Sequence, residues 1–296
     1  MKRPVIISLG EVLWDLFPDG EQFGGAPANF ACHAAIHGAE VSLISAVGDD
    51  QRGDKSLSIL RGHGIDVSLI QVFPDVPTGT VGVVLDSSGK PTFTIHEDSA
   101  WDQVTWNVEL GSRISGSDAV YFGTLGLRSE VSRTTIFRAV DAAVAAGIPR
   151  ILDVNLRSPF FDATLIRESV QRASILKLSH EELTEVCDAC GIDTASSPEL
   201  LLTRLLKRYG FDSVVMTRGA EGAMLATPNS IVEQAGISTT VVDTVGAGDS
   251  FTAAFLLGLL HGESPEVNLH NACVVAAAVC SHAGAVPSLQ PKAAPR

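Results

Sequence analysis

Short apolar runs alternate with segments of helical length along most of the chain, and no other feature of the sequence constrains the fold as strongly. Several of these runs are rich in β-branched residues, which is typical of strands buried on both faces of a sheet. Such an alternation requires right-handed crossovers between parallel strands, so we predict a three-layer α/β/α fold with a mostly parallel sheet. The predicted strands are Val5–Leu9, Val41–Val47, Ala119–Phe122, Ile151–Val154, Ile175–Leu178 and Ser213–Thr217. The predicted helices are Pro27–His37, Asp54–His63, Val131–Ala146, Glu181–Cys190, Pro198–Tyr209, Asp249–His261 and Val267–His282.

One stretch breaks this alternation and predicts a β-hairpin. Thr80–Asp86 and Pro91–Asp98 are strand-like, and Ser87–Lys90 between them has the composition of a tight turn. We expect this hairpin to join Glu11–Phe17 in a small β-lid beside the main domain, formed from about residues 11–24 and 79–100. The alternative is an edge hairpin of the main sheet with no role at any site.

The length and charge of the chain limit its domain count and its partners. A chain of 296 residues, 45% of them hydrophobic, can bury one large core, so we predict a single domain over residues 1–296. The net charge of −13 disfavours nucleic acid or an anionic membrane as a partner, because no basic stripe is available to release counterions. Acidic residues follow the first apolar run without a cleavage site, so we expect a buried first strand in a cytoplasmic protein.

The cysteines and histidines show no metal-site spacing. Cys187 and Cys190 have the spacing of half a zinc site, but the chain has five cysteines and no second pair with that spacing. We therefore interpret them as ordinary helix thiols. The eight histidines include no pair four apart on a helix with a glutamate beside it, as a zinc-binding helix would have, so we assign none of them to zinc.

A glycine-rich loop near the C-terminus carries the strongest functional signal. The sequence Asp243-Thr-Val-Gly-Ala-Gly-Asp249 directly precedes helical residues, and the first N–H groups of a helix have no partner within it. Gly246, Ala247 and Gly248 let the backbone approach a ligand closely, and the positive end of the helix dipole favours an anion there. We predict that these residues form an anion hole for a transferring phosphoryl group.

Asp249 lies beside this anion hole and is our candidate for the catalytic base. Phosphoryl transfer mainly requires positioning and charge neutralisation, and a carboxylate can take the proton of an attacking hydroxyl late in the reaction. The alternative is that Asp249 only caps the helix, since aspartate is a favoured N-cap residue. The Walker and dinucleotide-binding loops do not fit, because Gly-Lys-Ser/Thr is absent and the loop does not follow the first strand.

A second group of candidate residues lies in the N-terminal third of the chain. Asp15 can accept hydrogen bonds from two sugar hydroxyls, Gly24 and Gly25 admit a sugar ring close to the backbone, and Asn29 can both donate and accept. Phe93 in the predicted hairpin is a further candidate for substrate contact. The alternative is that Pro27 merely starts a helix at its first turn, with Gly24 and Gly25 as the preceding turn.

These motifs together resemble the ribokinase-like (PfkB) carbohydrate kinases, and particularly the fructokinase branch of that family. The resemblance extends over nearly the whole chain and rests on Gly10–Asp15, Gly24–Asn29 and the loop 243–249. It implies the ribokinase-like fold with a β-sheet lid and an enzyme that uses ATP and Mg²⁺ to phosphorylate a small sugar. Fructose is the favoured substrate. Ribose and 2-keto-3-deoxygluconate remain open, as does a non-catalytic sugar-binding regulator of the same fold.

The resemblance also implies roles for further positions. Arg157 follows a predicted strand and could meet the γ-phosphate beside the substrate, with a surface salt bridge as the alternative. Glu182 matches a family residue associated with hydrated Mg²⁺, but Ser179 stands where the family has asparagine, which predicts weaker support for the metal. The positions that match the nucleotide site are Lys177, Thr217, Gly219, Gly222 and Gly248.

The family often has a monovalent cation site, for K⁺, that is built largely of backbone carbonyls. The matching positions here are Asp243, Val245, Gly284 and Ser288. The lid is also where two chains would pair if the protein forms a homodimer.

Overall fold

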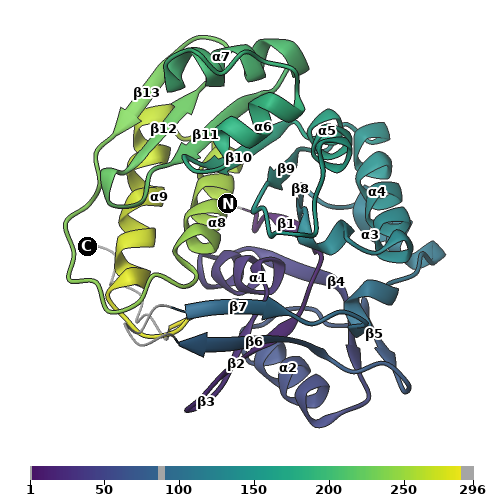
Figure 1. Cartoon of the computed structure of the whole chain (residues 1–296). Helices are drawn as coiled ribbons and strands as arrows, with labels where there is room; N and C mark the ends of the chain where they lie inside the picture. Colours follow the sequence, from purple (N-terminus) through teal and green to yellow (C-terminus); the bar gives the residue numbers. More distant parts are fainter. Residues whose placement is uncertain (1, 86–90, 288–296) are drawn as a thin grey trace.

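The central sheet fixes the arrangement of the whole protein. The structure is a computed structural model that describes residues 2–85 and 91–287, and within them nine strands form this sheet. The strands are Val5–Leu9 (β1), Glu40–Gly48 (β4), Ile70–Phe73 (β5), Ala119–Gly123 (β8), Arg150–Asp153 (β9), Ile175–Ser179 (β10), Ser213–Thr217 (β11), Ala223–Ala226 (β12) and Ile231–Gln234 (β13). Their order is β13-β12-β11-β10-β9-β8-β1-β4-β5 (Figure 1). Every neighbouring pair is parallel except β11–β12 and β12–β13.

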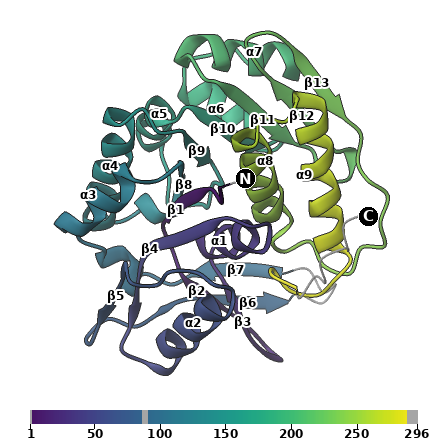
Figure 2. The ribbon, with the colours of Figure 1, turned by 180° about the vertical axis from the view of Figure 1, so that it is seen from behind.

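Helices cover both faces of this sheet, as Figure 2 shows from behind. One face is covered by α1 (Ala26–Ile36), α2 (Gln51–Gly62), α8 (Ala247–Leu260) and α9 (Pro265–Cys280). The other face is covered by α3 (Val108–Ser115), α4 (Glu130–Ala145), α5 (Ala163–Arg172), α6 (Leu183–Ala189) and α7 (Pro198–Tyr209). The predicted three-layer α/β/α fold is therefore confirmed. None of the helices in the described part of the chain is long and apolar enough to cross a membrane.

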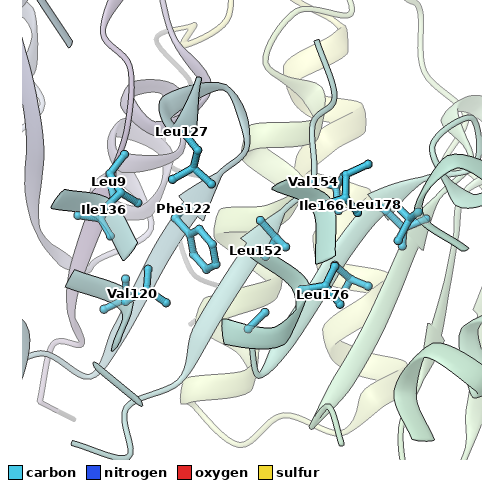
Figure 3. Packing of buried hydrophobic residues seen from close by; sticks show 14 of the residues in the cluster. Leu9, Val120, Phe122, Leu127, Ile136, Leu152, Val154, Ile166, Leu176 and Leu178 are labelled. Carbon is cyan, nitrogen blue, oxygen red and sulfur yellow. The ribbon is translucent and has the colours of Figure 1, made fainter. Parts of the chain in front are cut away.

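Side chains of the central strands alternate between two buried clusters. In β8, Val120 and Phe122 belong to the same cluster as Leu9 and lie near it in Figure 3. Ala119 and Tyr121 of the same strand belong to the cluster on the opposite face. Because both faces are buried, these strands read as continuous apolar runs, and their carboxyl ends are held rigidly.

Several short elements were not predicted from the sequence. These are α3, α5, β5, β12 and β13. A signal for α5 was present, because the side chain of Asp162 accepts a hydrogen bond from the N–H of Leu165 at 2.8 Å and caps the helix. The edge strand β13 has no fully buried residue, so it lacks the continuous apolar run of a central strand. Predicted helix starts at Asp54 and Glu181 lie at Gln51 and Leu183.

A separate four-stranded sheet, which we call the lid sheet, lies beside the main domain. Its strands are Leu13–Phe17 (β2), Gly20–Gly24 (β3), Gly79–Leu85 (β6) and Pro91–Ile95 (β7), in the order β3-β2-β6-β7. The β2–β6 pair is parallel and the other two pairs are antiparallel. The hairpin therefore does not extend the main sheet, and the edge-hairpin alternative is wrong. Its predicted turn, Ser87–Lys90, lies outside the described residues.

One carboxylate joins the lid sheet to the main domain. The Oδ1 atom of Asp50 accepts from the N–H of Gly53, at the start of α2, and from the hydroxyl of Thr78, each at 2.8 Å. Its Oδ2 atom accepts from the N–H of Thr78 at 2.8 Å. The hydroxyl oxygen of Thr78 also accepts from the N–H of Gly48, at the end of β4, at 2.9 Å. Asp50 thus fixes the chain at the point where β6 leaves the main domain.

We predict that Asp50→Ala lowers the free energy of unfolding by about 1–3 kcal/mol, because it removes a helix cap and leaves a backbone N–H without its acceptor. Urea unfolding measures this change. The matched control is Asp54→Ala, at an exposed acid in the first turn of the same helix, which should cost less than about 1 kcal/mol. Equal losses in the two variants would contradict the role given to Asp50.

Candidate active site

A cavity of about 590 Å³ lies at the carboxyl edge of the central sheet, enclosed by the lid sheet and the start of α8. Open α/β sheets bind ligands outside the carboxyl ends of their strands, where the strand order reverses, and here it reverses at β1. The predicted site residues that line the cavity are Asp15, Gly25, Asn29, Phe93, Arg157, Lys177, Val245, Gly246, Gly248 and Asp249. Those that do not line it are Gly24, Ala247, Glu182, Thr217, Gly219, Gly222, Asp243 and Gly284.

The start of α8 forms one wall of the cavity. Gly246 is the N-cap residue, with φ 78°, a conformation that favours glycine. A Cβ atom there would also lie 2.2 Å from the carbonyl oxygen of Ala285, so no other residue fits without movement of the backbone. Gly248 and Asp249 then lie in the first turn, where helix N–H groups lack intrahelical partners. The geometry is that of an anion-binding helix start.

Asp249 points to α1 rather than to its own helix start. Its Oδ2 atom accepts a hydrogen bond from Nδ2 of Asn29 at 2.8 Å, and no side chain caps α8. The interpretation of Asp249 as a cap alone is therefore wrong. Burial raises the pKa of Asp249, against the opposing effects of the Asn29 hydrogen bond and of the charges on Lys177 and Arg157. A buried carboxylate with a raised pKa is a stronger base.

The lid sheet and the start of α1 form the opposite wall. Gly25 is the N-cap of α1, with φ 106°, and a Cβ atom there would lie 2.5 Å from the carbonyl oxygen of Glu11. A Cβ atom on Gly24 would lie 2.9 Å from Oδ2 of Asp15, so both glycines leave room for neighbouring groups. The helix-start alternative also describes this segment correctly, since Pro27 lies in the first turn of α1. Burial raises the pKa of Asp15 to about 6.

Glu11 is a site residue that the sequence did not single out. It is buried, lines the cavity, and accepts a hydrogen bond from the N–H of Ala26 at 3.2 Å through Oε1. Oε2 has no hydrogen-bond partner among the described residues. Burial raises the pKa of Glu11 to about 7, and the nearby charge of Asp249 adds to the rise. The available signal was a charged residue only two positions after the end of the first strand.

A buried ion pair forms the floor of the cavity. Lys177 of β10 donates to Oδ1 of Asp153 on β9 at 3.0 Å, and the two residues are directly opposite each other in the parallel pair. Oδ2 of Asp153 accepts from the hydroxyl of Thr252, in α8, at 3.2 Å. Burial raises the pKa of Asp153 to about 6, although Lys177 opposes the rise. Lys177, predicted as an ATP contact, is thus paired within the protein, and Asp153 was not predicted as a site residue.

Two loops that follow β9 and β10 are tied together by Glu182. One oxygen of its carboxylate accepts from the N–H of Leu156 at 2.6 Å, and the other from the N–H of Ser179 at 2.8 Å. Arg157, next in the chain after Leu156, is exposed and lines the cavity. Within residues 2–85 and 91–287 it forms no ion pair, so the salt-bridge alternative finds no support there. Asn155, another cavity residue, has φ 41°.

The other predicted positions lie farther from the cavity. Thr217 ends β11 beside Ser179, and Gly222 has φ 96° in the turn before β12. Asp243 bridges two segments, because its carboxylate accepts from the N–H of Val245 at 3.0 Å and from the N–H of Gly284 at 2.9 Å. Ser288, the last predicted cation ligand, lies outside the described residues.

Comparison with known proteins identifies relatives over most of the chain. A profile of the pfkB family carbohydrate kinases matches residues 19–293. A fructokinase of Klebsiella pneumoniae is 33% identical over 265 residues, which cover 86% of this chain and 84% of the relative. The solved structure of a sugar kinase from Pyrococcus horikoshii in complex with ATP is 28% identical, with a TM-score of 0.79 over 95% of this chain and 94% of that one. The structure of a fructokinase from Vibrio cholerae O395 with fructose, ADP and calcium is 26% identical, with a TM-score of 0.78 over 96% and 94%.

We predict that Glu11→Gln changes the pH dependence of stability. A folded-state pKa of about 7, raised from 4.5, means that native Glu11 holds its proton while the unfolded chain releases it. Wild-type stability relative to Glu11→Gln should therefore fall as pH rises from 4.5 to about 7, by up to about 3 kcal/mol, and then level off. Urea unfolding of both proteins across this range measures the difference. A constant difference would contradict the buried, protonated state of Glu11.

Proposed function

The chain belongs to the pfkB family of carbohydrate kinases, and we propose that it is a fructokinase that transfers the γ-phosphoryl group of ATP to a hydroxyl of fructose. The proposal rests on one cavity, in which Asp249 at the start of α8 faces the same space as Asp15 and Phe93 of the lid sheet. A small sugar there would meet the base at one end and the lid at the other. Two of the relatives described above are fructokinases.

On the sugar side, Asp15 and Asn29 are the proposed hydroxyl partners. An ionised Asp15 accepts from two hydroxyls, and Gly24 and Gly25 keep the backbone open for the ring. Asn29 already donates to Asp249, so it joins the sugar-binding segment to the proposed base. Phe93 supplies an apolar surface against the ring.

Asp249 is the proposed base in the transfer step. Its carboxylate takes the proton of the attacking hydroxyl while the new O–P bond forms and the bond between the γ-phosphorus and the β-phosphate oxygen breaks, which releases ADP. The N–H groups of Gly246, Ala247 and Gly248 stabilise the negative charge on the phosphoryl oxygens. Arg157 is exposed and lines the same cavity, so its positive charge also stabilises the phosphoryl oxygens.

The residues at this edge of the sheet also fit ATP and Mg²⁺. Glu182 uses each carboxylate oxygen for one backbone N–H, which leaves lone pairs that can accept from metal-bound water. In the described ranges no cluster of His, Cys, Asp or Glu could enclose a metal by itself, as suits an ion held by phosphates and water. When bound, Mg²⁺ neutralises charge on the β- and γ-phosphates. Lys177, Thr217, Gly219 and Gly222 remain the proposed nucleotide contacts.

The charges around the cavity favour an uncharged sugar as substrate. Its described wall contains the acidic side chains of Glu11, Asp15, Asp153 and Asp249, and Arg157 and Lys177 are the only basic residues in that wall. Since Lys177 is paired with Asp153, little positive charge is left for a second phosphate on the sugar. This balance supports fructose over a sugar phosphate.

A K⁺ site and a dimer complete the proposal. The carboxylate of Asp243 accepts from the N–H groups of both Val245 and Gly284, and we propose that carbonyl groups of these two segments share one K⁺. Pairing of two chains through the lid sheet stays a prediction.

We predict that Asp249→Ala lowers kcat by about 10²- to 10⁴-fold, because the attacking hydroxyl loses its proton acceptor in the transition state. Fructose binding, followed by tryptophan fluorescence, should weaken by less than about tenfold, since the lid contacts remain. The control is Asp188→Ala, at an exposed acid in α6, which should leave kcat unchanged. Full activity of Asp249→Ala would remove Asp249 from the mechanism.

We predict that fructose stimulates ADP formation more than ribose, 2-keto-3-deoxygluconate or fructose 6-phosphate at equal concentrations. A coupled assay of ADP over this panel measures the rates, and calorimetry measures binding. Faster turnover of another sugar would replace fructose as the substrate. Binding of a sugar without any ADP formation would instead identify a sugar-binding regulator.

A further inference from the structure

Arg128 is a buried cation that no step of the proposed reaction uses. Only 5% of its side chain is exposed, and only 7% of that of its partner Asp102. Its Nε donates to Oδ1 of Asp102 at 2.9 Å and its Nη2 donates to Oδ2 at 2.7 Å. Nη2 also donates to the carbonyl oxygen of His96 at 2.7 Å. The planar guanidinium matches this arrangement, which the ammonium group of lysine cannot reproduce.

Two aromatic rings enclose the same guanidinium. Its central carbon lies 4.0 Å from the ring centroid of Trp101 and 4.7 Å from that of Phe160. Arg128 therefore joins three segments that are distant in the sequence: the residues after β7, the residues after η2 (Leu125–Leu127) and the loop after β9. We call Arg128, Asp102, Trp101 and Phe160 the arginine clamp.

The clamp contacts both points at which the chain passes between the main domain and the β6–β7 hairpin. His96, whose carbonyl accepts from Arg128, directly follows β7. Trp101 packs on the first residue of β6, since a Cβ atom on Gly79 would lie 2.5 Å from its Nε1. The N–H of Ala100 donates to the carbonyl oxygen of Pro77 at 2.8 Å, so the segment before β6 and the segment after β7 are bonded to each other. The clamp therefore contacts both ends of this half of the lid sheet.

The clamp also reaches two parts of the cavity wall. Phe160 donates its N–H to the carbonyl oxygen of Arg157 at 2.8 Å, in the loop that brings Arg157 to the cavity. Leu125, three residues before Arg128, lines the cavity as well. The β6–β7 strands contribute Val81 and Phe93.

We propose that Arg128 is a positioning residue, which holds the β6–β7 half of the lid sheet and the Arg157 loop at the spacing that the sugar requires. It touches neither substrate and acts through the walls that it joins. The expected effect on KM for fructose rests on the proposed function. The expected effect on the position of the lid sheet does not, and it is tested without any ligand.

The kinetic test compares Arg128→Met and Arg128→Lys with the wild type, with fructose as the sugar. Arg128→Met should raise KM for fructose about 10- to 100-fold, because displaced walls no longer fit the sugar, while kcat at saturating fructose falls less than tenfold. Arg128→Lys keeps the positive charge but not the planar, forked guanidinium, so its KM for fructose should lie between those of the wild type and Arg128→Met. The matched control is Arg138→Met, which removes another arginine stacked on a tryptophan, Trp106, at 4.5 Å and should leave KM unchanged.

The structural test is amide hydrogen exchange without ligands. In both Arg128 variants, exchange should become about tenfold faster or more in residues 93–101 and 157–160, while β1, β8 and β10 keep wild-type rates, because local opening does not require global unfolding. Arg138→Met should change neither region. If Arg128→Met does not fold, Arg128→Lys alone carries both tests.

Three results would overturn the proposal. These are unchanged exchange in residues 93–101, faster exchange spread evenly over the chain, and a loss of kcat with KM unchanged. If the wild type phosphorylates no sugar, the fructokinase proposal fails, but the exchange experiment still decides whether the clamp positions the lid.

Discussion

Parallel pairing of β1 with β8 and β4 is the constraint on which the rest of the structure depends. Parallel strands end at one edge of the sheet, so Glu11 after β1, Asp153 on β9 and Lys177 on β10 reach the same cavity although they are far apart in the sequence. Apolar clusters on both faces hold these strand ends in place. The start of α8 and the lid sheet cover this polar edge of the sheet and complete the cavity.

Such a polar edge is costly to bury, and the structure offsets part of the cost by pairing buried charged and polar groups with one another. Lys177 compensates Asp153, and Asn29 donates to Asp249, so these carboxylates have partners although burial raises the pKa of each. A buried ion pair often adds little stability compared with apolar residues of equal size. We therefore infer that Asp153 and Lys177 serve to orient the cavity floor beneath α8, where Thr252 also bonds to Asp153.

Features that are encoded in short sequence patterns were predicted, whereas contacts between residues distant in the sequence were not. The alternating runs predicted the three layers, and the glycines of the loop ending at Asp249 predicted a helix start there, as α8 shows. Anion binding at this helix start stays a prediction. The sequence could not show that Asn29 bonds to Asp249, because 220 residues separate them and neither motif contains the other. Glu11 and Arg128 were missed for a related reason: each is a single charged residue whose meaning comes from burial and from partners on other segments.

The two halves of the lid sheet are attached to the main domain in different ways. The β2–β3 half is attached to α1 and α2: the side chain of Glu11 accepts from the N–H of Ala26, and Nε1 of Trp14 donates to the hydroxyl of Ser56 at 2.9 Å. The β6–β7 half is attached through the side chains of Asp50 and Arg128. A single substitution can alter each of these side-chain contacts. Each wall of the cavity thus has its own attachment: Glu11 and Trp14 hold the wall of Asp15, and Asp50 and Arg128 hold the wall of Phe93.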